Sequence, residues 1–424
     1  MSRVKAVIGA GSVKQFAAAI ANALAKEATG NPYESDEPDP ATREAIADLT
    51  AAVRAIENLD AGDGVLFAPD NQTAALMMSF LAERQTEANV EPSVFETQLA
   101  HDDLAGWVTQ FAPAWLRGRF NKRPFVAPSL PVVQVENQFR LAVLGDWGSG
   151  LYGAPVSAAT IETTVPQFDA VLHLGDVYYA GTEKEVAERF LNIWPNIPRA
   201  TSWALNSNHE MFSGGAGYFG KTLKDARFSA QRGSSCFAWE NEYFVFLGLD
   251  TAYENHSVGP EQLAWIEERA RAGKHKKLIL FSHHQPFSAF ESAGSKLVAA
   301  LSGLLESGRI AAWYWGHEHR CVFFEKHPRW SLWGRCVGHG GFPQGRDRFE
   351  LPAESTNRDG SNWRQVAGAG VPSGWALDGP NRYIVGESEK YSPHGFVNLY
   401  FDGPVIREAV HAPDGALLLA HHAS

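Results

Sequence analysis

The sequence predicts a layered α/β fold, on the basis of its hydrophobic pattern and its composition. From Arg140 onward, short apolar runs alternate with amphipathic stretches, as expected when helices cover sheets of largely parallel strands. The 424 residues are 45% hydrophobic and 20% charged, which is enough apolar material for a packed interior. A chain of this length exceeds the usual size of one core, so we expect a main unit with at least one further segment.

The first 130 residues are predicted to be mostly helical. Ile46, Leu49, Val53 and Ile56 recur at helical spacing, and residues 73–84 are rich in Ala, Leu and Met. A stretch with several prolines, 124–131, then reads as a linker. We therefore expect residues 1–130 to form a helical N-terminal domain or arm.

Residues 138–345 are predicted to form the α/β core. Its expected buried strands are apolar runs at 141–144, 170–174, 203–205, 243–249, 278–281 and 310–315. Its expected helices are amphipathic stretches at 183–193, 260–272 and 296–306.

The closing segment, 346–424, is predicted to begin with loops and to end with strands that complete the core. Residues 342–392 are dense in Gly, Pro, Asn, Asp and Ser, a composition typical of long loops that carry binding determinants. Apolar runs at 396–401, 405–410 and 416–420 flank Asp-Gly turns, which favours antiparallel strands.

Charge and composition exclude several classes of protein. The balance of 37 basic against 48 acidic side chains gives a net charge of −11, the wrong sign for a sequence-independent grip on nucleic acid. No apolar run is long enough to span a membrane. Residues 1–25 imitate a secretory signal, but Lys14 and Gln15 interrupt the apolar run, so a cytoplasmic protein is expected, with a secreted or periplasmic one as the alternative. Three cysteines predict free thiols, with one disulfide left open.

Polar clusters follow five of the predicted strands. They are Gly145-Asp146-Trp147-Gly148, Gly175-Asp176-Val177-Tyr178-Tyr179, Asn206-Ser207-Asn208-His209-Glu210, Ser282-His283-His284 and Gly316-His317-Glu318-His319. The carboxyl ends of strands are where α/β sheets place their ligand sites. A glycine before Asp146, Asp176 and His317 is expected to permit a sharp turn that aims the next side chain across the edge.

These residue types predict a site with two metal ions. Asp, Asn and His suit divalent or trivalent ions of intermediate hardness, and enough of them converge to fill two coordination spheres. Two ions about 3.5–4 Å apart can activate a hydroxide and stabilise both the attacking and the leaving oxygen in displacement at phosphorus. The sequence therefore predicts an enzyme that hydrolyses phosphate esters.

The five motifs in this order resemble the metallophosphoesterase (calcineurin-like) superfamily over roughly residues 140–345. The resemblance implies a four-layer αββα sandwich of two mixed sheets. Within the superfamily, the chain is similar to the purple acid phosphatases, because Gly148 stands where most members have a ligating histidine and Tyr179 stands where purple acid phosphatases have an iron-binding tyrosinate. The implied cofactor is Fe(III) paired with Fe(II), Zn(II) or Mn(II).

The resemblance also implies a ligand for each coordination position. It assigns Asp146, Asp176, Tyr179 and His319 to one metal and Asp176, Asn208, His283 and His317 to the other, with Asp176 as the bridge. For the fourth motif, strand register favours His283 as the ligand, whereas the His-X-Pro spacing to Pro286 favours His284. We expect His283 to be the ligand.

Two further histidines are candidates for contact with the substrate. In the family, the residue at the position of His209 lies near the substrate phosphate, where an imidazole can donate a hydrogen bond or protonate a leaving alkoxide. His284 is a candidate second phosphate contact. Spacing alone assigns neither role.

The expected function is hydrolysis of a small phosphate monoester, as in purple acid phosphatases. One alternative is a phosphodiesterase of the same superfamily that uses a divalent metal pair. A second alternative, from another class, is a metal-binding regulatory protein that has kept the scaffold without its activity. The sequence leaves the substrate, its preference for monoesters or diesters, and the oligomeric state open.

Overall fold

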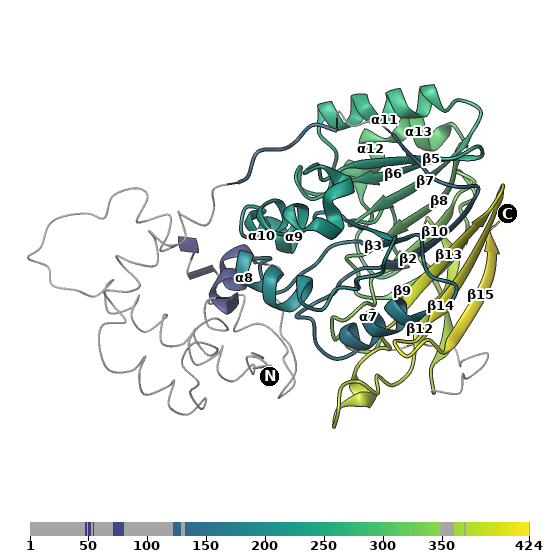
Figure 1. Ribbon diagram of the computed structural model, residues 1–424. Helices are drawn as coiled ribbons and strands as arrows, with labels where there is room; N and C mark the ends of the chain where they lie inside the picture. The colour runs from purple at the N-terminus through teal and green to yellow at the C-terminus, as the bar shows by residue number, and fades with distance from the viewer. Residues whose placement is uncertain are drawn as a thin grey trace, which may run out of the picture.

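The computed structural model describes residues 132–347, 360–368 and 370–423, together with 349, 122–128, 71–79 and five positions between 47 and 54. Most of the predicted N-terminal helical domain therefore lies outside the described residues. The described part confirms the α/β sandwich, with two mixed β-sheets and helices on their outer faces (Figure 1).

Sheet A is the larger of the two sheets. Its strand order is β1-β5-β6-β7-β8-β10-β9-β12-β11, and β6, β7, β8 and β10 run parallel. Its strands are β1 (Val133–Gln134), β5 (Phe237–Glu240), β6 (Phe244–Leu249), β7 (Lys277–Ser282), β8 (Ile310–Trp315), β9 (Cys321–Lys326), β10 (Trp333–Val337), β11 (Asn362–Gly368) and β12 (Val371–Asp378).

Sheet B has the strand order β15-β14-β13-β2-β3-β4. The parallel strands β2, β3 and β4 occupy one side and the antiparallel closing strands the other. Its strands are β2 (Gln138–Leu144), β3 (Ala170–His173), β4 (Thr201–Ala204), β13 (Phe396–Asp402), β14 (Val405–His411) and β15 (Leu417–Ala423). Both sheets include strands predicted from apolar runs, with bounds shifted by at most a few residues.

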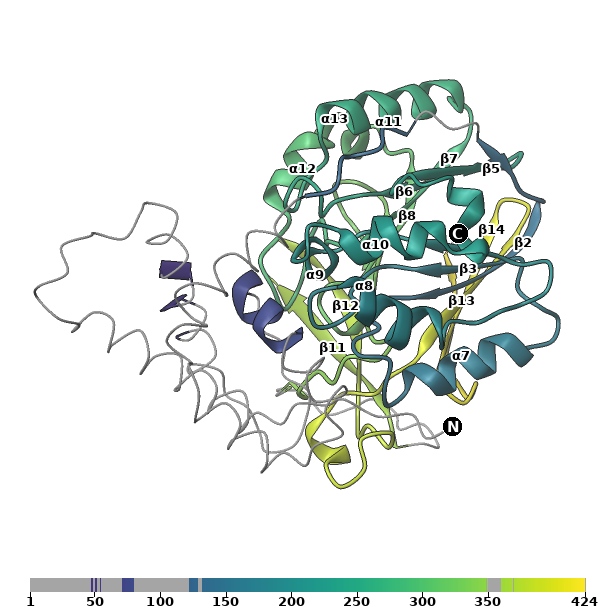
Figure 2. The ribbon, with the colours of Figure 1, turned by 60° about the vertical axis from the view of Figure 1, so that its left-hand side comes forward.

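Helices cover the outer face of each sheet. Those over sheet A are α11 (Pro260–Ala272), α12 (Ser295–Ala300) and α13 (Ser302–Glu306); those over sheet B include α7 (Ala154–Thr163), α8 (Glu183–Glu185) and the π-helical turn η2 (Val186–Leu191). The connections after β4 and β12 contain α9 (Asn208–Met211), α10 (Ala216–Gly220), η3 (Thr222–Lys224), η4 (Ala226–Gln231) and η5 (Ser388–Lys390). Figure 2 shows the same layers from another side.

The main core lies between the two sheets. Alternate residues of β2, such as Leu141 and Val143, meet Phe246, Phe281 and Tyr314 from sheet A, and all are buried. Burial of this apolar surface is the dominant favourable contribution to folding. It also holds the two sheets together, so that the ends of β2, β3 and β4 lie near the ends of β7 and β8.

The prediction of loops throughout residues 342–392 is wrong in part. Residues 362–378 form the antiparallel hairpin of β11 and β12, with Gly370 in a left-handed conformation (φ 75°) between the strands. Along β12, the buried residues Pro372, Gly374 and Ala376 alternate with more exposed ones. The density of Gly and Pro around the hairpin concealed this pattern of period two.

A short helix from the N-terminal region packs against the core. Residues 72–79 are helical, and residues 74–78 are buried. The Ser79 hydroxyl donates a hydrogen bond of 2.9 Å to Glu185, and the Gln72 amide donates one of 2.9 Å to the carbonyl of Phe212. This helix therefore covers the loops that follow β3 and β4, next to α8 (Figure 1).

Two smaller predictions are also tested by the structure. Cys236, Cys321 and Cys336 are free and buried, which confirms the prediction of free thiols. Among the helices that the structure describes, none combines the length and apolar character needed to cross a bilayer.

Candidate metal centre

The polar clusters meet at one edge of the sandwich, and both sheets contribute. Asp146 follows β2, Asp176 follows β3, and Asn208 is the first residue of α9 after β4. From sheet A, His283 follows β7, and His317 and His319 follow β8. Carboxyl ends of parallel strands share one edge of each sheet, and the packing of the two sheets brings together Asp146 and His319, which are 173 positions apart.

Several of these residues have a left-handed backbone. The φ angles are 58° for Asp146, 74° for Asp176, 71° for His317 and 54° for His319. This conformation is costly for side chains other than glycine and is retained mainly at functional sites. The local turn is therefore made by the candidate ligands themselves.

One of the three glycines that precede these residues has the turn conformation that was expected. Of Gly145, Gly175 and Gly316, only Gly175 has a positive φ, at 105°. At Gly316, a Cβ atom would lie 2.7 Å from Oδ1 of Asp146. Gly316 is thus required by close approach of the carboxylate rather than by a turn.

The carboxylate of Asp146 is fully buried and held by backbone amides. Its two oxygens accept hydrogen bonds from the N–H groups of His317 (2.9 Å) and His319 (3.0 Å). Burial raises the pKa of Asp146 to about 7. Asp146 thereby ties the end of β2 to the loop after β8.

Asp176 lies between two histidines. Its Oδ1 is 3.3 Å from Nε2 of His283, and its Oδ2 is 3.4 Å from Nε2 of His319. Burial opposes ionisation of Asp176, but His283, His209 and His319 together outweigh it and hold its pKa well below the usual range. Oδ1 is buried and accepts no hydrogen bond among the described residues.

The two neighbouring histidines of the fourth motif point to different partners. Nδ1 of His283 is 2.9 Å from the Leu174 carbonyl, and its Nε2 is 2.8 Å from Oδ1 of Asn208. His284 instead places Nδ1 2.9 Å from Oγ1 of Thr251. Hence His283 faces the Asp176 group, while His284 turns towards the loop after β6.

The two histidines after β8 complete this group. Nδ1 of His317 lies 3.2 Å from Nε2 of His283, and one atom each from Asp176, His283 and His317 fall within 4.8 Å of one another. Nδ1 of His319 lies 3.4 Å from Oε1 of Gln344. Burial keeps the pKa of His283 low, at about 4, and the pKa of His317 well below its usual range. Both imidazoles therefore favour the neutral form that binds metals.

The hydroxyl of Tyr178 contacts two of the candidate ligands. Its Oη donates to Oδ2 of Asp176 at 3.1 Å and lies 2.7 Å from Nε2 of His319. Its ring lies against those of His209 and Phe342, with centroid distances of 3.9 and 4.8 Å. The resemblance alone implied the next residue, Tyr179.

Tyr179 lies on the side of the loop that faces η2. The Arg189 guanidinium is 5.4 Å from the centroid of the Tyr179 ring. The backbone N–H of Tyr179 donates a hydrogen bond of 2.7 Å to Glu185. Glu185 also accepts from the N–H groups of Ala180 and Thr182, so one buried carboxylate orders this loop. The metal-ligand role of Tyr179 stays a prediction.

His209 lies beside this group, and buried polar contacts hold it there. Its Nδ1 is 2.6 Å from the Tyr179 carbonyl. The adjacent Glu210 accepts hydrogen bonds from the backbone amides of Asp176 and Val177 and from the Ser207 hydroxyl. Glu210 therefore fixes the loop after β3 to the start of α9, and burial raises its pKa to about 8.

Sequence reasoning missed three residues near the site. They are Tyr178, which was passed over for Tyr179; Gln344, from the predicted loop; and His256, from the loop after β6. The first could have been weighed because the two tyrosines are adjacent. The other two carry no local signal, because only tertiary packing brings them to the strand ends.

Comparison with known proteins gives a family match over the same region. Residues 139–321 match the family model described as calcineurin-like phosphoesterase. No curated protein matches the chain.

The solved structures that match the chain share little of its sequence. A dimetal phosphatase from Danio rerio is 11% identical with a TM-score of 0.40, covering 68% of this chain and 98% of that one. PhoD is 12% identical with a TM-score of 0.41, covering 70% of each chain. A predicted phosphoesterase from Streptococcus pneumoniae is 10% identical with a TM-score of 0.30, covering 68% of this chain and 98% of that one.

Proposed function

Residues 139–321 belong to the calcineurin-like phosphoesterases, and from this premise we propose that the chain hydrolyses phosphate monoesters at a centre of two metal ions. The observation that carries the proposal is the position of Asp176. Each oxygen of its carboxylate faces a different histidine, at 3.3 and 3.4 Å, as expected of a ligand shared by two ions. Its Oδ1 is buried without a hydrogen bond among the described residues, which leaves lone pairs for a cation.

The proposed ligands divide between the two ions as the family resemblance implies. Asp146, Asp176 and His319 with a tyrosine would hold one ion, and Asp176, Asn208, His283 and His317 would hold the other. The contacts of Tyr178 with Asp176 and His319 favour it over Tyr179 as the phenolate ligand. A phenolate ligand in turn favours Fe(III) at that position, with Fe(II), Zn(II) or Mn(II) at the other.

Protein groups outside the ligand set would orient these ligands. When Nδ1–H of His283 donates to the Leu174 carbonyl, its Nε2 keeps the lone pair for a metal, which is the usual arrangement of a ligating histidine. The 3.3 Å between Nε2 of His283 and Oδ1 of Asp176 supports His283 rather than His284 as the ligand. When bound, the ions would supply an activated hydroxide and offset the charge that develops at phosphorus.

His209 is the proposed proton donor. Its Nδ1 lies against the Tyr179 carbonyl, which fixes the ring orientation and directs Nε2 for contact with a phosphoryl or leaving oxygen. The ring packs against those of Tyr178 and Phe212, with centroid distances of 3.9 and 4.7 Å. Such packing holds an imidazole in one position.

The test is metal content together with turnover of 4-nitrophenyl phosphate. We expect two ions per chain in the purified protein, loss of turnover on chelation, and its return when metal is restored. Asp176→Ala and Asn208→Ala should each lose turnover while the far-UV circular dichroism is unchanged. The surface variant Asn192→Ala is the control and should retain activity.

Other outcomes would point to different functions. Faster hydrolysis of bis(4-nitrophenyl) phosphate would indicate a phosphodiesterase. Retained turnover in Asp176→Ala would contradict the proposal. A folded protein that binds metal but hydrolyses neither ester would favour a regulatory protein on this scaffold.

A further inference from the structure

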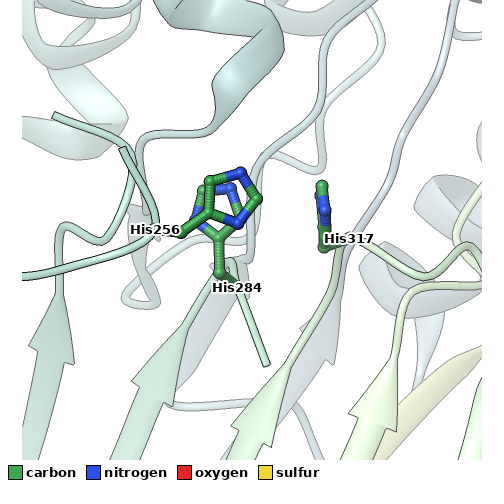
Figure 3. Close-up of side chains that lie close together, drawn as sticks. All are labelled: His256, His284 and His317. Carbon is green, nitrogen blue, oxygen red and sulfur yellow. The ribbon is translucent and has the colours of Figure 1, made fainter. Parts of the chain in front are cut away.

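A second group of histidines lies beside the proposed metal ligands. It consists of His256, His284 and His317, which approach one another from three separate segments (Figure 3). One nitrogen from each lies within 4.8 Å of the others. The ring centroids are 3.8 Å apart for His256 and His284, 4.6 Å for His284 and His317, and 5.3 Å for His256 and His317. Three imidazoles with an open fourth position are a common ligand set for Zn²⁺.

His284 is arranged as a ligating histidine would be. Its side chain is 1% exposed, and its Nδ1 lies 2.9 Å from Oγ1 of Thr251. Its Nε2 is buried and has no hydrogen-bond partner among the described residues. A buried nitrogen without a hydrogen-bond partner lowers the stability of the folded state, and coordination to a metal ion would remove this cost.

The loop that positions Thr251 also presents His256. Asp250 accepts hydrogen bonds from the N–H groups of Ala252 and Tyr253, and Ser257 N–H donates to the Thr251 carbonyl. Within this ordered loop, His256 has a φ of 63°. A left-handed conformation is uncommon for a histidine and is usually retained where the side chain has a use.

His317 belongs to both groups of ligands. It lies with Asp176 and His283 in one group and with His256 and His284 in the other. A neutral imidazole has a single lone pair, so it can serve only one ion at a time. Binding at the second group therefore competes with the proposed two-metal centre for His317.

We propose that His256, His284 and His317 form a Zn²⁺ site whose occupation takes His317 from the two-metal centre and inhibits the enzyme. The inhibitory effect rests on the proposed function, whereas Zn²⁺ binding by the three histidines does not. The site is distinct from the two-metal centre because His256 and His284 are not among the ligands proposed for that centre.

The experiment is a Zn²⁺ titration of the protein already loaded with two ions, followed by equilibrium dialysis and by turnover. Wild type should bind one further Zn²⁺ per chain and lose activity as that ion binds. His256→Ala should lose the further equivalent and resist inhibition while keeping its basal activity. Thr251→Val, which removes the partner of His284, should weaken binding of this Zn²⁺ by about 10–100-fold.

His275→Ala, at an exposed histidine after α11, is the matched control and should behave as wild type. Unchanged Zn²⁺ stoichiometry and unchanged inhibition in His256→Ala would overturn the proposal. If the wild type has no esterase activity, the dialysis result still decides whether the three histidines bind Zn²⁺, so failure of this site and failure of the proposed function are distinguishable.

Discussion

The phenol oxygen of Tyr178 lies 2.7 Å from Nε2 of His319. It also lies 3.1 Å from Oδ2 of Asp176, so it contacts two of the proposed ligands of the same ion. The ring is fully buried and stacks on Phe342. This contact places a phenol beside the proposed metal ligands, one residue before the tyrosine that the family resemblance implies.

A pair of variants decides which tyrosine binds the metal. In protein loaded with iron, we expect a visible charge-transfer band from tyrosinate to Fe(III). Tyr178→Phe should abolish this band because it removes the hydroxyl next to His319, and Tyr179→Phe should retain it. Loss of the band only in Tyr179→Phe would restore the assignment made from the sequence.

His283 and His284 should differ in their effect on metal content. At two equivalents of metal, His283→Ala should retain only one ion, because Nε2 of His283 lies 3.3 Å from the shared carboxylate of Asp176. His284→Ala should retain both ions. Metal analysis after gel filtration measures this, and the reverse result would show that the His-X-Pro spacing identifies the ligand.

Gly316→Ala should weaken metal binding without a change at any ligand. The new Cβ atom would lie 2.7 Å from Oδ1 of Asp146, so the carboxylate must move. We expect a loss of metal affinity measurable by competition with a chelator. Gly303→Ala in α13, where a Cβ meets nothing within 4 Å, is the control and should stabilise the fold by about 0.5–1 kcal/mol. Equal metal affinity in both variants would contradict the steric explanation.

Removal of His209 should slow hydrolysis most for substrates that have poor leaving groups. An imidazole that protonates the leaving oxygen contributes about 10²–10⁴-fold to the rate. His209→Ala should lose about that much on alkyl phosphates and much less on 4-nitrophenyl phosphate, whose leaving group needs no proton. Steady-state kinetics on both substrates measure the difference. A uniform loss on both would indicate that His209 positions the phosphate instead.

The buried pair of Arg335 and Glu408 should make stability depend on acid pH. The guanidinium donates to both oxygens of Glu408 at 2.9–3.0 Å, and both side chains are at most 1% exposed. Burial opposes the charged carboxylate, but Arg335, with His421 and Tyr314, outweighs it and lowers the pKa of Glu408 to about 2.

The direction of the pH effect follows from the lowered pKa. The folded state binds the proton on Glu408 more weakly than the unfolded chain does, whose carboxyl has the ordinary pKa of 4.5. The pair's contribution is therefore fully present above about pH 4.5 and is lost as the pH falls towards about 2. Urea unfolding at pH 7, 4.5 and 3 should show this decline.

Variants of the pair test the same interaction. Arg335→Met leaves a buried carboxylate without its partner and should cost about 3–5 kcal/mol at pH 7. Glu306→Gln, in the exposed pair with Arg329, is the control and should change stability by less than about 1 kcal/mol. A small effect of Arg335→Met would contradict the importance of the buried pair.

The sequence by itself determined the central strands of this protein and the candidate residues that follow them. Apolar runs of three to seven residues predicted the central strands because a strand buried on both faces needs a continuous apolar segment. The polar residues from Asp146 to His319 were identified by their position, because each belongs to a cluster that begins where an apolar run ends. The family resemblance then ordered them into ligand sets.

Only the tertiary structure decided which neighbours these residues have. Tyr178 and Tyr179 are chemically identical in sequence, and the path of the loop ordered by Glu185 brings the Tyr178 hydroxyl to His319. His256 carries no motif and reaches His284 only because the loop after β6 folds over the end of β7. A local sequence pattern reflects the periodicity of one helix or strand. Contacts such as these depend on how separate elements pack, and no short stretch of sequence encodes that packing.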